Sequence, residues 1–278
     1  MNVRTLSLSI GLTLALTATP AAHAVQGCGN AQLNGNFAMQ FSGTSLPAVA
    51  TGIGGVAVPS NLAVPPANAT AVPVAGIAHF YLDGNGNLSG TSSLNLAGSW
   101  LQGAVSGAYT VNSDCTVSLT MTDSSGATEN FSGVLVGNGQ SFFVTQTDAG
   151  AGVSGTAKIQ SGTCQTSNIS GTFGFQTSGT IGATNEPSNS TGVISLDGQG
   201  NATLAEWRTS NGVSSQSVLS GSIAVNSDCS AVLSLTSQAD GSAANYFGIV
   251  LFDQMRTPQF LLVQSDAGTA VTGVIVAQ

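Results

Sequence analysis

The sequence has few charged residues, and very few of them are basic. Charged side chains make up 6% of the 278 residues, with four Lys and Arg against twelve Asp and Glu, a net charge of −8. Soluble domains usually hold about 25% charged residues. So few cations cannot form a basic stripe, and an acidic surface repels phosphates, so nucleic acid is excluded as a partner.

The same shortage removes most of the side chains that acid–base catalysis uses. Histidine occurs only twice, at His23 and His79. No Gly-x-Ser-x-Gly elbow accompanies the many serines, so a Ser-His-Asp arrangement has no support from the local sequence. His79 alternates with apolar neighbours, as a histidine within a strand does. We therefore expect no enzyme, no catalytic residue and no cofactor.

Long apolar runs are also absent after the first residues of the chain. At the N-terminus, Arg4 precedes the apolar run 6–18, and Ala22-His23-Ala24 forms a small-x-small cleavage site. This pattern predicts a signal peptide over 1–24 and export to the medium, the periplasm or the cell surface. The remaining chain has no segment long and apolar enough to span a membrane as a helix.

What the sequence does contain is an internal duplication. CGNAQLNGNFAMQFSGT from Cys28 returns as CQTSNISGTFGFQTSGT from Cys164, a shift of 136. LDGNGN from Leu82 returns as LDGQGN from Leu196, a shift of 114, and QTDAG returns as QSDAG with a shift of 118. The chain therefore contains two copies of one unit, which we place at 25–160 and 161–278.

The change of shift from 136 to 114 places a 22-residue insertion in the first copy. It lies near 45–74, a stretch rich in Pro, Ala and Val. Prolines at this density do not fit a helix interior or a central strand, so we expect a long extended loop. Apolar side chains of this loop are candidate contacts for a ligand or a partner: Val56, Val58, Leu62 and Val64.

Within each unit the apolar residues repeat with period two, which is typical of half-buried strands. Phe37, Met39 and Phe41 alternate with small or polar residues, and Gly- and Asn-rich turns such as Asp83-Gly84-Asn85-Gly86 separate the apolar runs. We count roughly seven to nine short antiparallel strands per unit. A sheet of this size must close or fold over, which predicts two tandem β-barrels, with two β-sandwiches as the alternative.

The four cysteines occupy equivalent places in the two copies. If the ancestral unit folded alone, its two cysteines paired with each other, which predicts the disulfides Cys28–Cys115 and Cys164–Cys229 in an oxidising compartment. Two alternatives remain open. The first is a metal or redox site, although no CxxC motif is present, and the second is lipid attachment at Cys28, because residues 25–28 loosely resemble a lipoprotein box.

Two further clusters carry a functional and a structural interpretation. Glu206, Trp207 and Arg208 bring an acid, an aromatic ring and a base together, and the first copy has Trp100 at a different register. We take Trp100 and Trp207 as candidate ligand or partner contacts at a barrel mouth, with an exposed strand end as the alternative. The motif from Asp83 begins like a calcium loop but lacks its twelfth-position Glu, so a turn without metal is expected.

The leading Cys, the Gly-x-Phe first strand, the DGNG hairpin and the Val-Asn-Ser-Asp-Cys step together resemble a group of secreted bacterial proteins with tandem repeats. The resemblance implies small calycin-like or allene-oxide-cyclase-like β-barrels, and it implies no particular binding residue. The favoured function is an exported, non-catalytic binding module that holds a small apolar ligand or contacts a partner. The alternative is a structural, self-associating protein of the cell surface, a matrix or a filament, and an enzyme working in a barrel mouth ranks below both.

Overall fold

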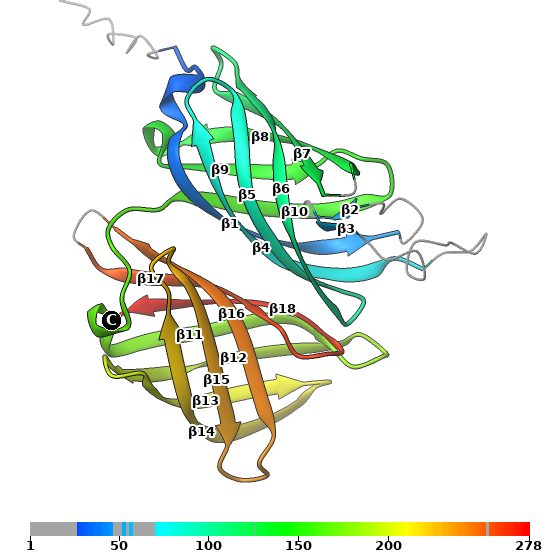
Figure 1. The fold of residues 1–278 in the computed structure, drawn as a ribbon. Coiled ribbons are helices and arrows are strands. Elements are labelled where there is room, and N and C mark those ends of the chain that lie inside the picture. The colour runs from blue at the N-terminus through cyan, green and yellow to red at the C-terminus, as the bar shows by residue number, and fades with distance from the viewer. Residues whose placement is uncertain (1–26, 47–51, 54–55, 58–69, 125, 254–255) are drawn as a thin grey trace, which may run out of the picture.

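The protein consists of two closed eight-stranded antiparallel barrels that follow each other along the chain (Figure 1). The computed structural model describes residues 27–46, 52–53, 56–57, 70–124, 126–253 and 256–278. The expected all-β class with two tandem antiparallel barrels is confirmed, and both sheets close into barrels rather than forming sandwiches. The signal peptide expected over 1–24 lies outside the described residues.

Each barrel is a meander in which neighbours along the chain pair, and the last strand closes onto the first. The first barrel contains β1 (Asn34–Ser45), β4 (Val72–Asp83), β5 (Asn87–Leu96), β6 (Ser99–Val111), β7 (Thr116–Asp123), β8 (Thr128–Val136), β9 (Ser141–Gln146) and β10 (Ala151–Ile159). The second contains β11 (Ser170–Ile181), β12 (Glu186–Asp197), β13 (Asn201–Ser210), β14 (Val213–Val225), β15 (Ser230–Ser237), β16 (Ala243–Phe252), β17 (Pro258–Gln264) and β18 (Thr269–Ala277).

Three short 3-10 helices complete the described elements: η1 (Asn30–Gln32), η2 (Gly137–Gly139) and η3 (Thr166–Asn168). None of the helices in the described part of the chain is long and apolar enough to cross a membrane.

The two barrels have the same strand registers, so each residue of a paired strand in one barrel has a counterpart in the other. Ser45 pairs with Val72 where β1 ends, and Ile181 pairs with Glu186 at the same point of the second barrel. The first strands β1 and β11 differ by 136 residues, and the other strands match with shifts of 114, 115 or 118. The sequence repeat therefore corresponds to a structural repeat, and counterparts can be compared one by one.

Both barrel interiors are filled by side chains, as expected for barrels of eight strands. In the first barrel the rings of Phe37, Phe80 and Phe142 lie with centroids 5.7 to 6.5 Å apart. In the second, Phe175 meets Tyr246 edge-on at 5.8 Å. The inward residues of every strand alternate with outward ones, which is the period-two pattern of the sequence.

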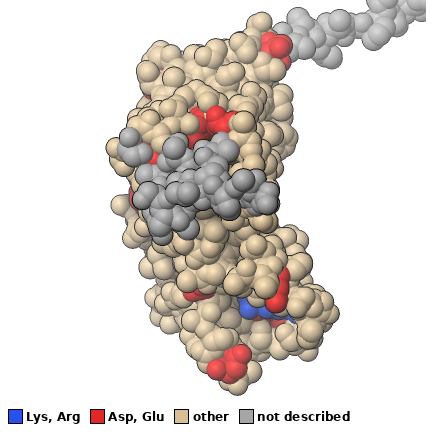
Figure 2. All heavy atoms as spheres, turned by 90° about the vertical axis from the view of Figure 1, so that its right-hand side faces the viewer, with Lys and Arg blue, Asp and Glu red and all other residues tan. Residues whose placement is uncertain are grey.

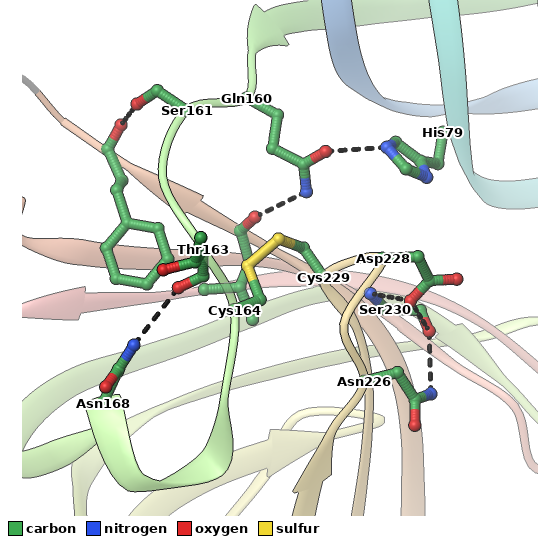
Figure 3. Close-up of a disulfide and its surroundings, with 12 residues drawn as sticks. His79, Gln160, Ser161, Thr163, Cys164, Asn168, Asn226, Asp228, Cys229 and Ser230 are labelled. Atoms are coloured by element: carbon green, nitrogen blue, oxygen red, sulfur yellow. Dashed lines mark hydrogen bonds between the residues drawn. A yellow bond between two sulfur atoms is a disulfide. The ribbon is translucent and has the colours of Figure 1, made fainter.

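The disulfides pair as the duplication predicts, Cys28 with Cys115 and Cys164 with Cys229. Each ties the segment before the first strand of its barrel to the turn after the fourth. Figure 3 shows the second of them beside the linker 160–163. Each bond closes its own barrel, which restricts the unfolded chain without crosslinking the two units.

The barrels pack against each other through an apolar interface. The outer face of β1 and β4 contributes Ala38, Ala75 and Ile77. The outer face of the second barrel contributes buried residues from its last three strands: Ile249, Leu251, Leu261, Val263 and Ala270. Beside this interface Gln160 of the linker joins the barrels, because its Oε1 lies 2.7 Å from His79 Nε2 and its Nε2 donates to the Val250 carbonyl (Figure 3). The two units therefore form one body.

The insertion of the first copy leaves the barrel between β1 and β4, and two short strands of it are described. β2 (Gly52–Ile53) and β3 (Val56–Ala57) pair as a small hairpin. β3 lies against β5 and β6, and β2 lies against β8. The hairpin therefore approaches strands from both sides of the first barrel at the end where the insertion emerges, whereas the second barrel has only the turn 182–185 there.

Candidate functional site

The two tryptophans proposed as ligand contacts lie in different surroundings. Trp100, the second residue of β6, is half-buried between the barrels, and its ring centroid lies 6.1 Å from that of Phe247. Trp207 lies on the outer face of β13 with 58% of its surface exposed. Trp100 therefore contacts the second barrel, and Trp207 alone of the two presents a free ring.

The contacts proposed in the insertion fall mostly outside the described residues. Val58, Leu62 and Val64 lie there entirely, and only the backbone of Val56, at the start of β3, is described. Their role stays a prediction.

The residues flanking Trp207 point the other way, into the second barrel, because side chains alternate along a strand. Glu206 is buried, with 3% of its surface exposed. Its carboxylate accepts hydrogen bonds from Ser190 Oγ and, at 3.2 Å, from Ser217 Oγ, and it forms an ion pair with Arg208 Nε at 3.7 Å. A buried carboxylate requires such partners, since desolvation penalises an isolated charge.

Tyr246 of β16 completes this cluster. Burial raises the pKa of its hydroxyl, against the opposing charge and hydrogen bond of Arg208. The Arg208 side chain, 30% exposed, therefore lies close to both Glu206 and Tyr246 and reaches solvent. We call Ser190, Glu206, Arg208, Ser217 and Tyr246 the mouth cluster.

The first barrel carries no such cluster at the same place. The counterparts of Glu206 and Arg208 are Ser92 and Leu94, as the matching registers show. Here the ring of Phe41 lies against Gly76, where an added Cβ would come within 2.2 Å of the ring. The counterparts of Phe41 and Gly76 in the second barrel are Thr177 and Ser190. Duplication was thus followed by divergence at this place, toward apolar packing in the first barrel and an ion pair with a buried carboxylate in the second.

The mouth cluster borders a groove in the wall of the second barrel. β14 pairs with β15 only over residues 219–225, so its first residues extend beyond the end of β15. The opening left beside them has a volume of about 440 Å³ and is lined by Ala205, Glu206, Trp207, Gln216, Ser217, Val218, Gln238 and Ala239. Glu206 and Ser217 reach it from the interior, and Trp207 and Val218 from outside.

Figure 2 shows how sparse charged side chains are on one face of the molecule. On the face shown, basic side chains are visible at one place, on the second barrel and beside acidic ones. Arg208 with Glu206 is the ion pair found among the described residues. The groove thus combines the exposed ring of Trp207 with the buried carboxylate of Glu206.

Two wider hollows, of about 740 Å³ each, lie where the linker passes between the barrels. Lys158 and Gln259 line the first, with Lys158 Nζ donating to Gln259 Oε1 at 3.1 Å. Arg256 and Asp253 line the second. We take the smaller groove as the candidate site, because Trp207 places an aromatic ring there beside the buried carboxylate of Glu206, and ligand sites combine apolar walls with a few polar groups.

The turn that begins at Asp83 uses its carboxylate internally. Oδ1 accepts hydrogen bonds from the backbone amides of Asn85 and Asn87 at 2.7 and 2.9 Å, and Oδ2 accepts one from Asn87 Nδ2 at 2.6 Å. The Asn87 side chain and these amides lower the pKa of Asp83 to about 2. The motif is a turn held by its own acid, and Asp197 repeats it. Within the described ranges no group of three or more His, Cys, Asp or Glu could hold a metal ion.

No protein-family description matches the chain, and no curated protein matches it in sequence. A solved structure with some similarity is the Aeromonas veronii immune modulator A, with 8% identity over 87% of this chain and 93% of its own, and a TM-score of 0.27. A similarity of this size does not identify a common fold. The calycin-like class therefore stays a prediction, and the barrel architecture rests on the strand pairing.

Sequence reasoning missed the partners of Glu206 and the polar residues of the barrel interface. Ser190 and Ser217 lie on strands either side of β13, 16 and 11 residues away from Glu206 in sequence. Asn95, fully buried, donates to the Asp266 carbonyl at 2.9 Å across the interface. The period-two pattern does assign Glu206 and Arg208 to one side of β13 and Trp207 to the other, which is the signal that could have separated their roles.

Proposed function

We propose that this chain is an exported, non-catalytic binding protein whose ligand site is the groove of the second barrel. The ligand is a small, mainly apolar molecule with one polar group. The observation that carries the proposal is the exposed ring of Trp207 beside the buried carboxylate of Glu206, on opposite faces of one strand that borders an opening in the barrel wall.

The chemistry of the lining supports this class of ligand. Trp207, Val218, Ala205 and Ala239 offer an apolar wall, and burial of apolar area supplies the main free energy of binding for such molecules. Ser217 and the neighbouring glutamines offer hydrogen-bonding groups for one polar substituent. The two disulfides and the predicted signal peptide support a site of action outside the cytoplasm.

Titration with a neutral apolar dye such as Nile red tests the proposal. The comparison is between the parent, Trp207→Ser and a matched control, Val213→Ser, which removes another exposed apolar side chain of the same hairpin that does not line the groove. Trp207→Ser should weaken the dye's Kd about tenfold, the equivalent of about 1.4 kcal/mol. The control should bind like the parent.

Intrinsic fluorescence provides a second readout, because the chain has only two tryptophans. Dye binding should quench the emission of a Trp100→Phe variant, which keeps Trp207, and leave that of Trp207→Phe nearly unchanged. Equal dye affinity in the parent and Trp207→Ser would refute the groove as the site. Native mass spectrometry of the protein purified from its natural source would then detect a ligand bound at another place on the protein.

A further inference from the structure

The interface between the two barrels joins two different surfaces of one duplicated unit. The first barrel uses the outer face of β1, β4 and β5, and the second uses the outer face of β16, β17 and β18. Such a contact is heterologous, because it joins two different surfaces of the repeated unit. Each barrel contributes one of these surfaces to the contact and leaves its equivalent of the other surface free.

Both unused surfaces are present. The free face of the second barrel includes the counterparts of Gln40, Ile77, His79, Ser93 and Asn95, which are Gln176, Thr191, Val193, Trp207 and Thr209. The interface residues Ala38, Ala75 and Trp100 correspond there to Gly174, Asn189 and Ser214. The free face of the first barrel comprises the counterparts of Ile249, Leu251, Leu261, Val263 and Val274, which are Val134, Val136, Phe143, Thr145 and Thr156.

The free face of the first barrel retains the apolar pair at its centre. Ile249 and Leu261 are neighbours across β16 and β17 and are buried in the interface, with exposures of 1% and 4%. Their counterparts Val134 and Phe143 are neighbours across β8 and β9 and are exposed by 42% and 50%. An exposed Val–Phe pair on an otherwise polar barrel wall marks a surface suited to association.

The free face of the second barrel also retains its hydrogen-bonding group. Across the interface Gln40 Nε2 donates to the carbonyls of Leu262 and Gly273 at 2.8 and 2.7 Å. Its counterpart Gln176 is exposed.

The acceptors for that group have counterparts as well. Leu262 and Gly273 correspond to Val144 and Gly155, which are paired across β9 and β10. A hollow of about 400 Å³ lies over these two residues on the first barrel. A glutamine arriving from another molecule in the geometry of Gln40 would enter this hollow.

We propose that copies of this chain bind one another head to tail, with the free face of the second barrel of one copy docking on the free face of the first barrel of the next. The contact repeats the one that joins the two barrels within a chain. None of the residues that define the two faces is charged, so docking buries no ion. The net charge of −8 opposes approach at long range, and salt screens this repulsion.

Sedimentation velocity of the full chain across protein and salt concentrations tests the proposal. The parent should sediment faster as its concentration rises, and more so in high salt. Phe143→Asp blocks one face and Trp207→Asp blocks the other, and each side chain points outward, so each variant should fold and remain monomeric. Phe143→Ser provides a second variant with a milder change. The control Val232→Asp changes an exposed valine of β15 outside both faces and should assemble like the parent.

Mixing the two blocked variants gives the decisive result. Each retains one intact face, so an equimolar mixture should form one-to-one dimers and nothing larger. A parent that stays monomeric at every concentration, a mixture that stays monomeric, or loss of assembly in Val232→Asp would overturn the proposal. Phe143 does not line the ligand groove, so unchanged dye affinity in Phe143→Asp separates this outcome from that of the proposed function.

Discussion

At the scale of single residues, one place inside the second barrel holds a group of side chains that depend on one another. Glu206 and Arg208 stand where Ser92 and Leu94 stand in the first barrel. A carboxylate placed inside a barrel needs a cation and hydroxyl donors, and Arg208, Ser190 and Ser217 provide them.

This mutual dependence leads to a prediction for the Arg208→Leu variant, which copies Leu94 of the first barrel. It removes the cation and leaves the Glu206 carboxylate buried, so we expect a loss of about 1–3 kcal/mol in the free energy of unfolding. The double variant Glu206→Ser with Arg208→Leu copies the first barrel at these two positions and should recover most of that loss, because the buried charge is removed together with its partner. Urea unfolding curves measure both. A double variant no more stable than the single one would contradict the prediction.

At the scale of elements, the strand hairpins are local structures that each barrel repeats with the same register. The insertion between β1 and β4 does not disturb this register, since Ser45 and Val72 still pair at the end of the two strands. Its described hairpin lies against β5, β6 and β8. The insertion is therefore an addition to a complete barrel.

Replacing residues 46–71 with the turn 182–185 of the second barrel tests this view. Loop length contributes little to the free energy of unfolding, with about 0.6 kcal/mol for each doubling, so the shortened protein should fold, form both disulfides and keep nearly the same Tm. The first barrel should bind no more apolar dye than in the parent, because side chains already fill its interior. Calorimetry and dye titration in a Trp207→Ser background measure these outcomes. A shortened protein that fails to fold would show instead that the insertion belongs to the core.

At the scale of the whole molecule, the apolar interface makes two barrels into one body. Ile249 lies at its centre, and its counterpart Val134 lies on the exposed wall of the first barrel. The two positions are equivalent in the repeat, but the first barrel covers Ile249 whereas Val134 is exposed to solvent.

The pair allows a matched prediction. Ile249→Asp buries an unpaired charge between the barrels and should lower the free energy of unfolding by about 3–5 kcal/mol, or separate the single thermal transition into two as the barrels uncouple. Val134→Asp, made on a solvated surface, should change it by no more than about 0.5 kcal/mol. Differential scanning calorimetry at low protein concentration distinguishes them, and equal effects at the two positions would contradict the interface described here.

Much of this architecture follows from the sequence alone. The period-two pattern and the Gly- and Asn-rich turns determine short strands joined by hairpins, because both depend on residues close together in the chain. The repeat determines that there are two units. It also predicts the pairing of Cys28 with Cys115 and Cys164 with Cys229, on the premise that a unit able to fold alone closes its own disulfide, and the structure confirms it.

Only the tertiary structure decided which outward faces meet. Alternation along a strand distinguishes residues that point into the barrel from those that point outward. Ile77 and Thr191 both point outward, and the local sequence does not show that the other barrel covers Ile77 while Thr191 stays exposed. The same holds for Trp100 and Trp207, which the sequence treats alike and the structure places in the interface and in solvent. Contacts between barrels join residues more than a hundred positions apart, such as Gln40 and Leu262. Which residues meet depends on the shape and packing of the surfaces of two folded barrels, and the local sequence pattern carries no information on that packing.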